Sequence, residues 1–134
     1  MPNLFLLFSH TLTPEQVKDA NEVLGVKKIV SLPLSLQEMW SNIDPAGELQ
    51  TETLDEIALW LKENGKKDDF VLIQGEFGAT YYLTEFCFSA GFIPIYATSR
   101  RIYEEIKNDD GTIERKHIFK HVNFRRYVRW GKGY

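Results

Sequence analysis

Continuous apolar runs and periodic apolar positions alternate along the chain, and together they predict strands alternating with helices. Four short runs have the length of strands in a parallel sheet, and all are unbroken apolar runs except residues 28–32, which include Lys28 and Ser31. They are residues 4–8, 28–32, 70–73 and 92–97. Three stretches between or after them repeat apolar residues at intervals of three and four, the spacing of one buried helix face. They are residues 14–24, 53–64 and 78–90.

Local signals mark where several of these helices begin and end. Thr13, Pro14 and Gln16 form a capping box with a proline in the first turn, which is a strong helix start. Ser35 is expected to cap a short helix that runs through Trp40. A glycine follows each of the longer periodic stretches, in the position where helices usually end. Strands that alternate with helices predict an α/β fold with a mostly parallel sheet.

The C-terminal quarter is expected to differ from this core. Residues 102–107 and 113–119 flank Asp110-Gly111, a turn sequence that favours a β-hairpin. An alternative makes Ser99 the cap of a short helix through Ile106. We prefer the hairpin, which leaves a single domain of residues 1–134. Its α/β core spans 1–98, and a hairpin and tail span 99–134.

Pro94 qualifies the expectation for the strand at residues 92–97. Proline has no backbone N–H and cannot donate to a sheet ladder. The strand is therefore expected to lie near an edge of the sheet or to carry a bulge, and to end at Thr98-Ser99-Arg100-Arg101.

Composition is ordinary for a globular protein, with 43% hydrophobic and 26% charged residues among 134. The sequence has neither an apolar stretch of the ~18 residues typical of a membrane span nor a signal-peptide pattern. A cytoplasmic protein without membrane contact is therefore expected. Cys87 is the one cysteine and lies on the apolar stripe of residues 78–90, which predicts a buried, unreactive thiol.

The net charge of −3 conceals a division between the two parts of the chain. Residues 1–98 carry 6 Lys/Arg against 14 Asp/Glu, whereas residues 99–134 carry 10 against 5. A basic segment of this kind suits a nucleic acid or a polyphosphate partner. A solvated hairpin explains it equally well.

Polar clusters follow three of the expected strands. They are Ser9-His10-Thr11, Gln74-Gly75-Glu76-Phe77-Gly78 and Thr98-Ser99-Arg100-Arg101. The carboxyl ends of parallel strands share one edge of a sheet, where open α/β sheets bind their ligands. Arginine forks, the first amides of a helix and an aromatic ring all suit phosphates and nucleobases. Glu76 is the one acidic residue among them, so any phosphate chemistry is expected to need no metal ion.

Each of these residues also has a purely structural interpretation. Gly75 and Gly78 fit neither the dinucleotide nor the Walker pattern, and the turn alone explains them. His10 is explained equally well as a loop residue without a role in binding, and Glu76 is explained by pairing with a nearby arginine. Arg100 and Arg101 are adjacent in a strand, so their side chains are expected on opposite faces.

Four motifs, taken in order, resemble those of one known family. They are F-L-L-F-S-H-T-L-T-P-E-Q (5–16), Q-G-E-F-G (74–78), Y-A-T-S-R-R (96–101) and F-K-H-V-N-F-R-R-Y (119–127). Over nearly its whole length the chain resembles the small, stand-alone Csx-type CRISPR-associated ring nucleases. These are relatives of the CRISPR-associated Rossmann-fold (CARF) sensor domains. The resemblance implies a Rossmann-like, CARF-like fold and a homodimer whose strand-end edges face each other around cyclic tetra-adenylate.

The resemblance also implies an activity, namely cleavage of the ring by attack of a ribose 2′-hydroxyl on its neighbouring phosphodiester. The products would be linear oligoadenylates with a 2′,3′-cyclic phosphate, which switches off type III CRISPR signalling without a cofactor, a metal or a long nucleic acid. Arg100, His10 and Ser9 are the residues expected to take part in the reaction. The residues expected to bind the ring are Gln74, Gly75, Glu76, Phe77, Gly78, Ala79, Thr98, Ser99, Arg101, His121 and Arg125.

A binding module is the alternative to the enzyme. Such a module would sense or sequester a cyclic nucleotide without cutting it. A Rossmann-like fold alone does not decide between the two, because a fold does not specify a chemistry.

Overall fold

The computed structural model describes all 134 residues and contains five strands and four helices. The strands are β1 (Asn3–Phe8), β2 (Lys28–Ser31), β3 (Phe70–Gln74), β4 (Ile93–Lys107) and β5 (Ile113–Arg126). The helices are α1 (Pro14–Glu22), α2 (Leu34–Ser41), α3 (Thr51–Asn64) and α4 (Phe77–Ala90). The predicted strands and helices of the core are thus present in the predicted order.

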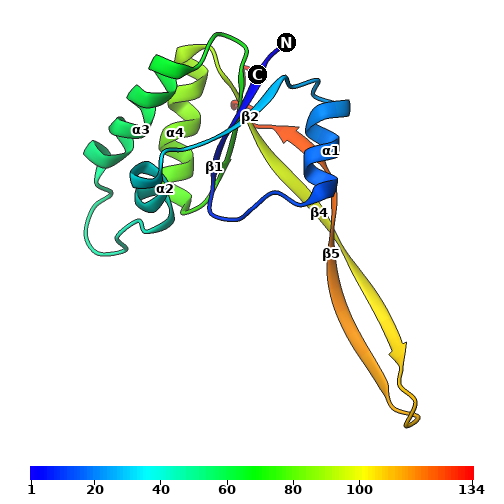
Figure 1. Cartoon of the computed structure of the whole chain (residues 1–134). Coiled ribbons are helices and arrows are strands. Elements are labelled where there is room, and N and C mark those ends of the chain that lie inside the picture. The colour runs from blue at the N-terminus through cyan, green and yellow to red at the C-terminus, as the bar shows by residue number, and fades with distance from the viewer.

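All five strands form one sheet in the order β2-β1-β3-β4-β5, and only the pair β4–β5 is antiparallel. Figure 1 shows α1 on one face and α2, α3 and α4 on the other. The strand order reverses between β1 and β3. The prediction of an α/β fold with a mostly parallel sheet and a C-terminal hairpin is confirmed. At such a reversal point, the carboxyl ends of the strands are where open α/β sheets bind ligands.

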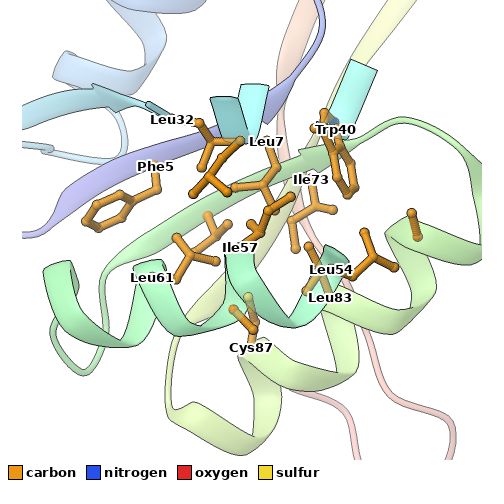
Figure 2. Close-up of a cluster of buried hydrophobic side chains, with 14 of the residues drawn as sticks. Phe5, Leu7, Leu32, Trp40, Leu54, Ile57, Leu61, Ile73, Leu83 and Cys87 are labelled. Carbon is orange, nitrogen blue, oxygen red and sulfur yellow. The ribbon is translucent and has the colours of Figure 1, made fainter. Parts of the chain in front are cut away.

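The larger part of the core lies between the sheet and α2, α3 and α4. The predicted apolar stripes of α3 and α4 both face it, and Figure 2 shows the side chains that meet there. They include Phe5, Leu7, Trp40, Leu54, Ile57, Leu61, Ile73, Leu83 and Cys87. The predicted burial of Cys87 is confirmed, and this burial raises the pKa of its thiol to about 12.

Beyond the sheet, β4 and β5 continue as a two-stranded ribbon of residues 100–107 and 113–120, which we call the arm. Figure 1 shows the arm extending away from the body. The predicted hairpin at Asp110-Gly111 is confirmed. The prediction that the strand ends at Thr98 to Arg101 is wrong, because β4 runs on to Lys107. A bulge between Thr98 and Ser99 changes the local twist where the arm leaves the sheet.

The strand with Pro94 lies near an edge of the sheet, as expected, because only β5 lies beyond β4. This strand pairs with β3 on one side and β5 on the other. The carbonyl of Pro94 accepts a hydrogen bond from the Tyr127 N–H at 3.1 Å, one residue past the end of β5 at Arg126. The missing N–H is therefore tolerated because the β4–β5 ladder is already ending at this position.

Helix ends agree with the sequence at Thr13, Gly65 and Gly91 and differ at Ser35. The capping box of Thr13 and Gln16 is present, and Gly91 ends α4 with a φ of 84°. Ser35 is not a cap, because α2 already begins at Leu34 and has no side-chain cap. α3 ends at Gly65 as predicted, but this glycine is extended, with a φ of −98°. A Cβ there would lie 2.6 Å from the Phe92 ring, so close packing explains this glycine.

Candidate functional site

The carboxyl edge of the sheet brings the ends of β1 and β3 level with the middle of β4. Phe8 pairs with Gln74, and the Gln74 side-chain Oε1 accepts a hydrogen bond from the Ala97 N–H at 2.8 Å. The next residues along these strands are Ser9, Gly75 and Thr98. Adjacent strands lie about 4.8 Å apart, so Ser9 and Thr98 stand about 10 Å apart on either side of Gly75. This edge, at the reversal of strand order, is the candidate site.

Several polar groups at this edge already have partners within the chain. Ser9 Oγ lies 3.2 Å from Ser41 Oγ of α2. Thr98 Oγ1 lies 2.5 Å from Asn123 Oδ1 of β5. The Phe8 carbonyl accepts from Gln37 Nε2 at 2.9 Å. These contacts fix the positions of the hydroxyls at the edge before any ligand binds.

The N-terminus of α4 differs from the anion site that the sequence suggested. Glu76 occupies the cap position, and its carboxylate accepts hydrogen bonds from the amides of Gly78 at 2.8 Å and Ala79 at 3.0 Å. The negative charge that a helix N-terminus favours is thus supplied by the chain itself. An external anion would reach the amides of Gly78 and Ala79 only after Glu76 had moved away.

Replacing Glu76 with alanine is expected to lower the free energy of unfolding by about 1 kcal/mol, because the cap is lost. Urea unfolding followed by circular dichroism measures the change. Glu85→Ala is the matched control, since Glu85 is exposed on the same helix and caps nothing; its effect should stay within about 0.5 kcal/mol. Equal effects of the two variants would contradict the capping role.

Gly75 is explained by packing against Trp40. A Cβ at residue 75 would lie 2.8 Å from the Trp40 ring, and Trp40 Nε1 donates to the Gln74 carbonyl at 3.2 Å. The φ of Gly75 is not positive, so the backbone itself does not demand glycine. The indole of α2 therefore supports the turn between β3 and α4 from beneath. The glycine serves this contact, and close approach of a ligand is not needed to account for it.

His10 lies on the α1 side of the sheet, edge to face with Phe8 at a centroid distance of 5.3 Å. It lines a cavity of about 620 Å³ together with Ser9, Thr11, Leu12 and Gln37. This cavity lies between the ends of β1 and β2 and contains no cationic side chain.

Arg100 and Arg101 lie on the arm just beyond the edge, both exposed and on opposite faces as predicted. Arg101 is directly opposite Phe119, with its guanidinium 5.6 Å from the ring centroid. Arg100 is directly opposite Lys120. Neither Arg100 nor Lys120 forms an ion pair within the chain.

Arg100 and His10 are not brought together within one chain. Ser99, the neighbour of Arg100, pairs with His121, which faces α1. Arg100 therefore faces the side of α4, whereas His10 lies on the side of α1. A ligand that contacts both must extend across the edge.

His121 links the base of the arm to α1. Its Nε2 lies 2.8 Å from Asp19 Oδ2, and its side chain is only 6% exposed. Its Nδ1 has no hydrogen-bond partner. Arg125 lies near the end of β5, on the face opposite to that of His121, and its guanidinium is 5.9 Å from the Tyr96 ring. Of the two, Arg125 is on the same face as Arg100.

Sequence reasoning did not select Lys120. The sequence did contain a signal for it. In a hairpin whose turn is centred on Asp110, residues equally far from Asp110 lie opposite each other, so Lys120 lies opposite Arg100. Phe77 is 92% exposed at the start of α4, where its ring is free to stack.

No three His, Cys, Asp or Glu side chains are grouped so that they could hold a metal. None of the helices combines the length and apolar composition of a membrane span.

Comparison with known proteins gives a family. Residues 2–125 match the model of the "Uncharacterized protein MJ1673 family". The "Uncharacterized protein MJ1673" of Methanocaldococcus jannaschii is 46% identical over 127 residues, covering 95% of this chain and 98% of the relative. The chain belongs to the MJ1673 family. No solved structure matches it.

The MJ1673 family match spans the whole candidate site. It includes every candidate residue from Ser9 to Arg125 and all of the arm. Arg126 at the end of β5 and the tail from Tyr127 to Tyr134, with the exposed Trp130, lie outside it. The residues of the edge and of the arm thus lie within the match to the MJ1673 family, whereas the tail is not covered by it.

Proposed function

We propose that this protein is a CARF-like ring nuclease of the cytoplasm, which binds cyclic tetra-adenylate at the carboxyl edge of its Rossmann-like sheet and cleaves it. In this proposal the protein acts as a homodimer. The edges of the two copies enclose the ring, and cleavage switches off type III CRISPR signalling. The motif resemblance suggests the ligand, and the geometry of the edge supports an anionic one.

The observation that carries the proposal is the pair Arg100 and Lys120. Like charges placed directly opposite each other on two antiparallel strands are destabilising, and no carboxylate compensates this pair. The pair lies about two residues, or about 7 Å, beyond Thr98 at the edge. An anion bound there would turn the repulsion into a favourable arrangement. A phosphodiester is the anion that fits an arginine fork beside a second cation.

The proposed reaction is a transesterification. The 2′-oxygen of one adenosine attacks the adjacent phosphorus and loses its proton, while the bond from phosphorus to the 5′-oxygen breaks and that oxygen takes up a proton. The products are a 2′,3′-cyclic phosphate and a 5′-hydroxyl, and neither water nor a metal is consumed. Arg100 and Lys120 would stabilise the charge that develops on the phosphoryl oxygens. A ring that lies across the edge would also reach His10 and Ser9.

A non-catalytic sensor or sequestering module is the second candidate. The observation that favours it is the separation of His10 from Arg100 on opposite faces of the sheet. Without a proton-transferring group beside the Arg100–Lys120 pair, the edge would hold a phosphodiester without cutting it.

Incubation with cyclic tetra-adenylate in excess chelator distinguishes the two. We expect linear products that end in a cyclic phosphate, formed over many turnovers and identified by chromatography and mass spectrometry. Adding Mg²⁺ or Mn²⁺ should not change the rate. An intact ring that co-elutes with the protein would support the sensor. An intact, unbound ring would contradict both candidates, and activity that appears only with added metal would contradict the proposed mechanism.

A further inference from the structure

We propose that the arm is the dimerisation element of this protein, and that its partner is the arm of a second copy, crossed antiparallel about a two-fold axis. The inference deepens the homodimer of the proposed function by naming the element that holds it together. The arm carries apolar side chains on both faces, open strand edges and a complementary distribution of charge.

The arm presents apolar side chains that its own body does not cover. On one face Tyr103 and Phe119 are 64% and 69% exposed. On the other face Ile102 lies directly opposite Ile118, which is 39% exposed. Single exposed apolar residues are normal on a surface, but a ribbon with apolar residues on both faces resembles an interface.

The arm is also too slender to be stable by itself. From Arg100 to Lys107 the strand advances about 25 Å, at about 3.4 Å per residue. Over this length β4 and β5 pair only with each other, so both outer edges of the ribbon are unpaired. An isolated two-stranded hairpin is marginal in water, and open edges pair readily with another chain. A second arm supplies both the apolar cover and a partner for an edge.

The charges along the arm are self-complementary. Its base, residues 100–102 and 118–120, carries Arg100, Arg101 and Lys120 and no acidic residue. Its distal part, residues 103–117, carries five carboxylates against three Lys/Arg. When two arms cross antiparallel about their middle through the face of Arg101 and Tyr103, Arg101 of each approaches Glu105 of the other, and Arg100 and Lys120 stay free on the opposite face. A two-fold axis makes the surface complementary to itself in this way.

The same distribution disfavours a long nucleic acid as the occupant. A strand of phosphates along the arm would lie over the five distal carboxylates, of which Glu105 has a cationic partner in Arg115 at 3.6 Å. Phosphate binding requires an accumulation of Lys and Arg that the distal part lacks.

Sedimentation equilibrium without ligand tests the inference. The wild type is expected to be a dimer at micromolar concentration, and Tyr103→Asp should raise the dimer dissociation constant by about 100-fold or more, because a symmetric interface receives the charge twice. Leu59→Asp is the matched control, since Leu59 is exposed on α3, and it should remain dimeric. A monomeric wild type would overturn the inference. A Tyr103→Asp variant that dimerises normally would also overturn it, as would a wild-type monomer that binds single-stranded RNA through the arm.

Cross-linking gives a second test that needs no charge in the apolar surface. Tyr103→Cys places a thiol near the middle of the arm, where two crossed arms meet, and a short bis-maleimide should link two copies. Leu59→Cys is the control and should give no covalent dimer. The native Cys87 does not interfere, because it is buried and its thiol pKa is raised to about 12. Equal cross-linking of the two variants would contradict the crossed arms.

The outcomes separate this inference from the proposed function. A dimer that depends on Tyr103 but leaves the ring intact and unbound would retain the arm as the dimerisation element and overturn the ring nuclease. A protein that cleaves the ring as a monomer, or as a dimer insensitive to Tyr103→Asp, would retain the activity and overturn the arm as the dimerisation element.

Discussion

Arg100→Ala is expected to lower the rate of ring cleavage by about 100-fold or more, because it removes the charged fork that would hold the scissile phosphate. Single-turnover cleavage of cyclic tetra-adenylate measures the chemical step directly. Arg100→Lys should restore little of the rate, since a lysine keeps the charge but cannot form a bidentate contact. The fold should not change, because Arg100 is exposed and forms no ion pair.

Arg126→Ala is the matched control for Arg100→Ala. Arg126 is an exposed arginine of β5. It pairs with Ile95, at the end of the β4–β5 ladder that is farthest from the arm, and its guanidinium lies 5.1 Å from the Tyr134 ring. Its removal should leave the cleavage rate within about two-fold of the wild type, since an exposed substitution far from a site changes little. Wild-type activity in Arg100→Ala would remove this residue, and the cationic pair with Lys120, from the site.

Trp40→Ala is expected to lower the free energy of unfolding by about 3–5 kcal/mol. The side chain is 2% exposed, packs in the larger part of the core and donates to the Gln74 carbonyl. The change leaves a large cavity and an unpaired carbonyl beneath the turn at Gly75. Total stabilities of about 5–15 kcal/mol are typical, so the variant should be marginally folded and is best measured by urea titration at low temperature.

Trp130→Ala is the matched control for Trp40→Ala. Trp130 is 98% exposed in the tail, and its removal should change the free energy of unfolding by less than about 0.5 kcal/mol. A Trp40→Ala variant that loses under 1 kcal/mol would contradict the supporting role of this indole. Binding assays with the same variant would then show whether the edge depends on α2.

Local patterns in the sequence were sufficient for most of the fold. The periodic stripes of α3 and α4 were predicted because a helix places residues three and four apart on one face. The capping box at Thr13 and the turn at Asp110-Gly111 were predicted because their hydrogen bonds join residues close in sequence. These signals do not depend on the rest of the chain.

The candidate site was predictable in place but not in detail. That the ends of β1 and β3 share an edge follows from the parallel arrangement. The role of Glu76 was missed, since an acidic residue before a helix reads equally as a cap or as a ligand-binding group. The length of β4 was missed because Thr98 to Arg101 is polar, although pairing with β5 keeps that segment extended. Trp40 and Trp130 look alike in sequence but differ completely in burial.

The sequence by itself determined the helices, the strands, their order and the buried thiol, because neighbouring residues encode these features through helical and strand periodicity. Only the tertiary structure decided that Arg100 and His10 lie on opposite faces, that Lys120 stands opposite Arg100, and that His121 contacts Asp19. Those arrangements depend on strand register and on a bulge between Thr98 and Ser99, at which the register of β4 and β5 shifts by one residue. Register is set by pairing between strands, and paired residues such as Leu4 and Phe70 are 66 positions apart in the sequence.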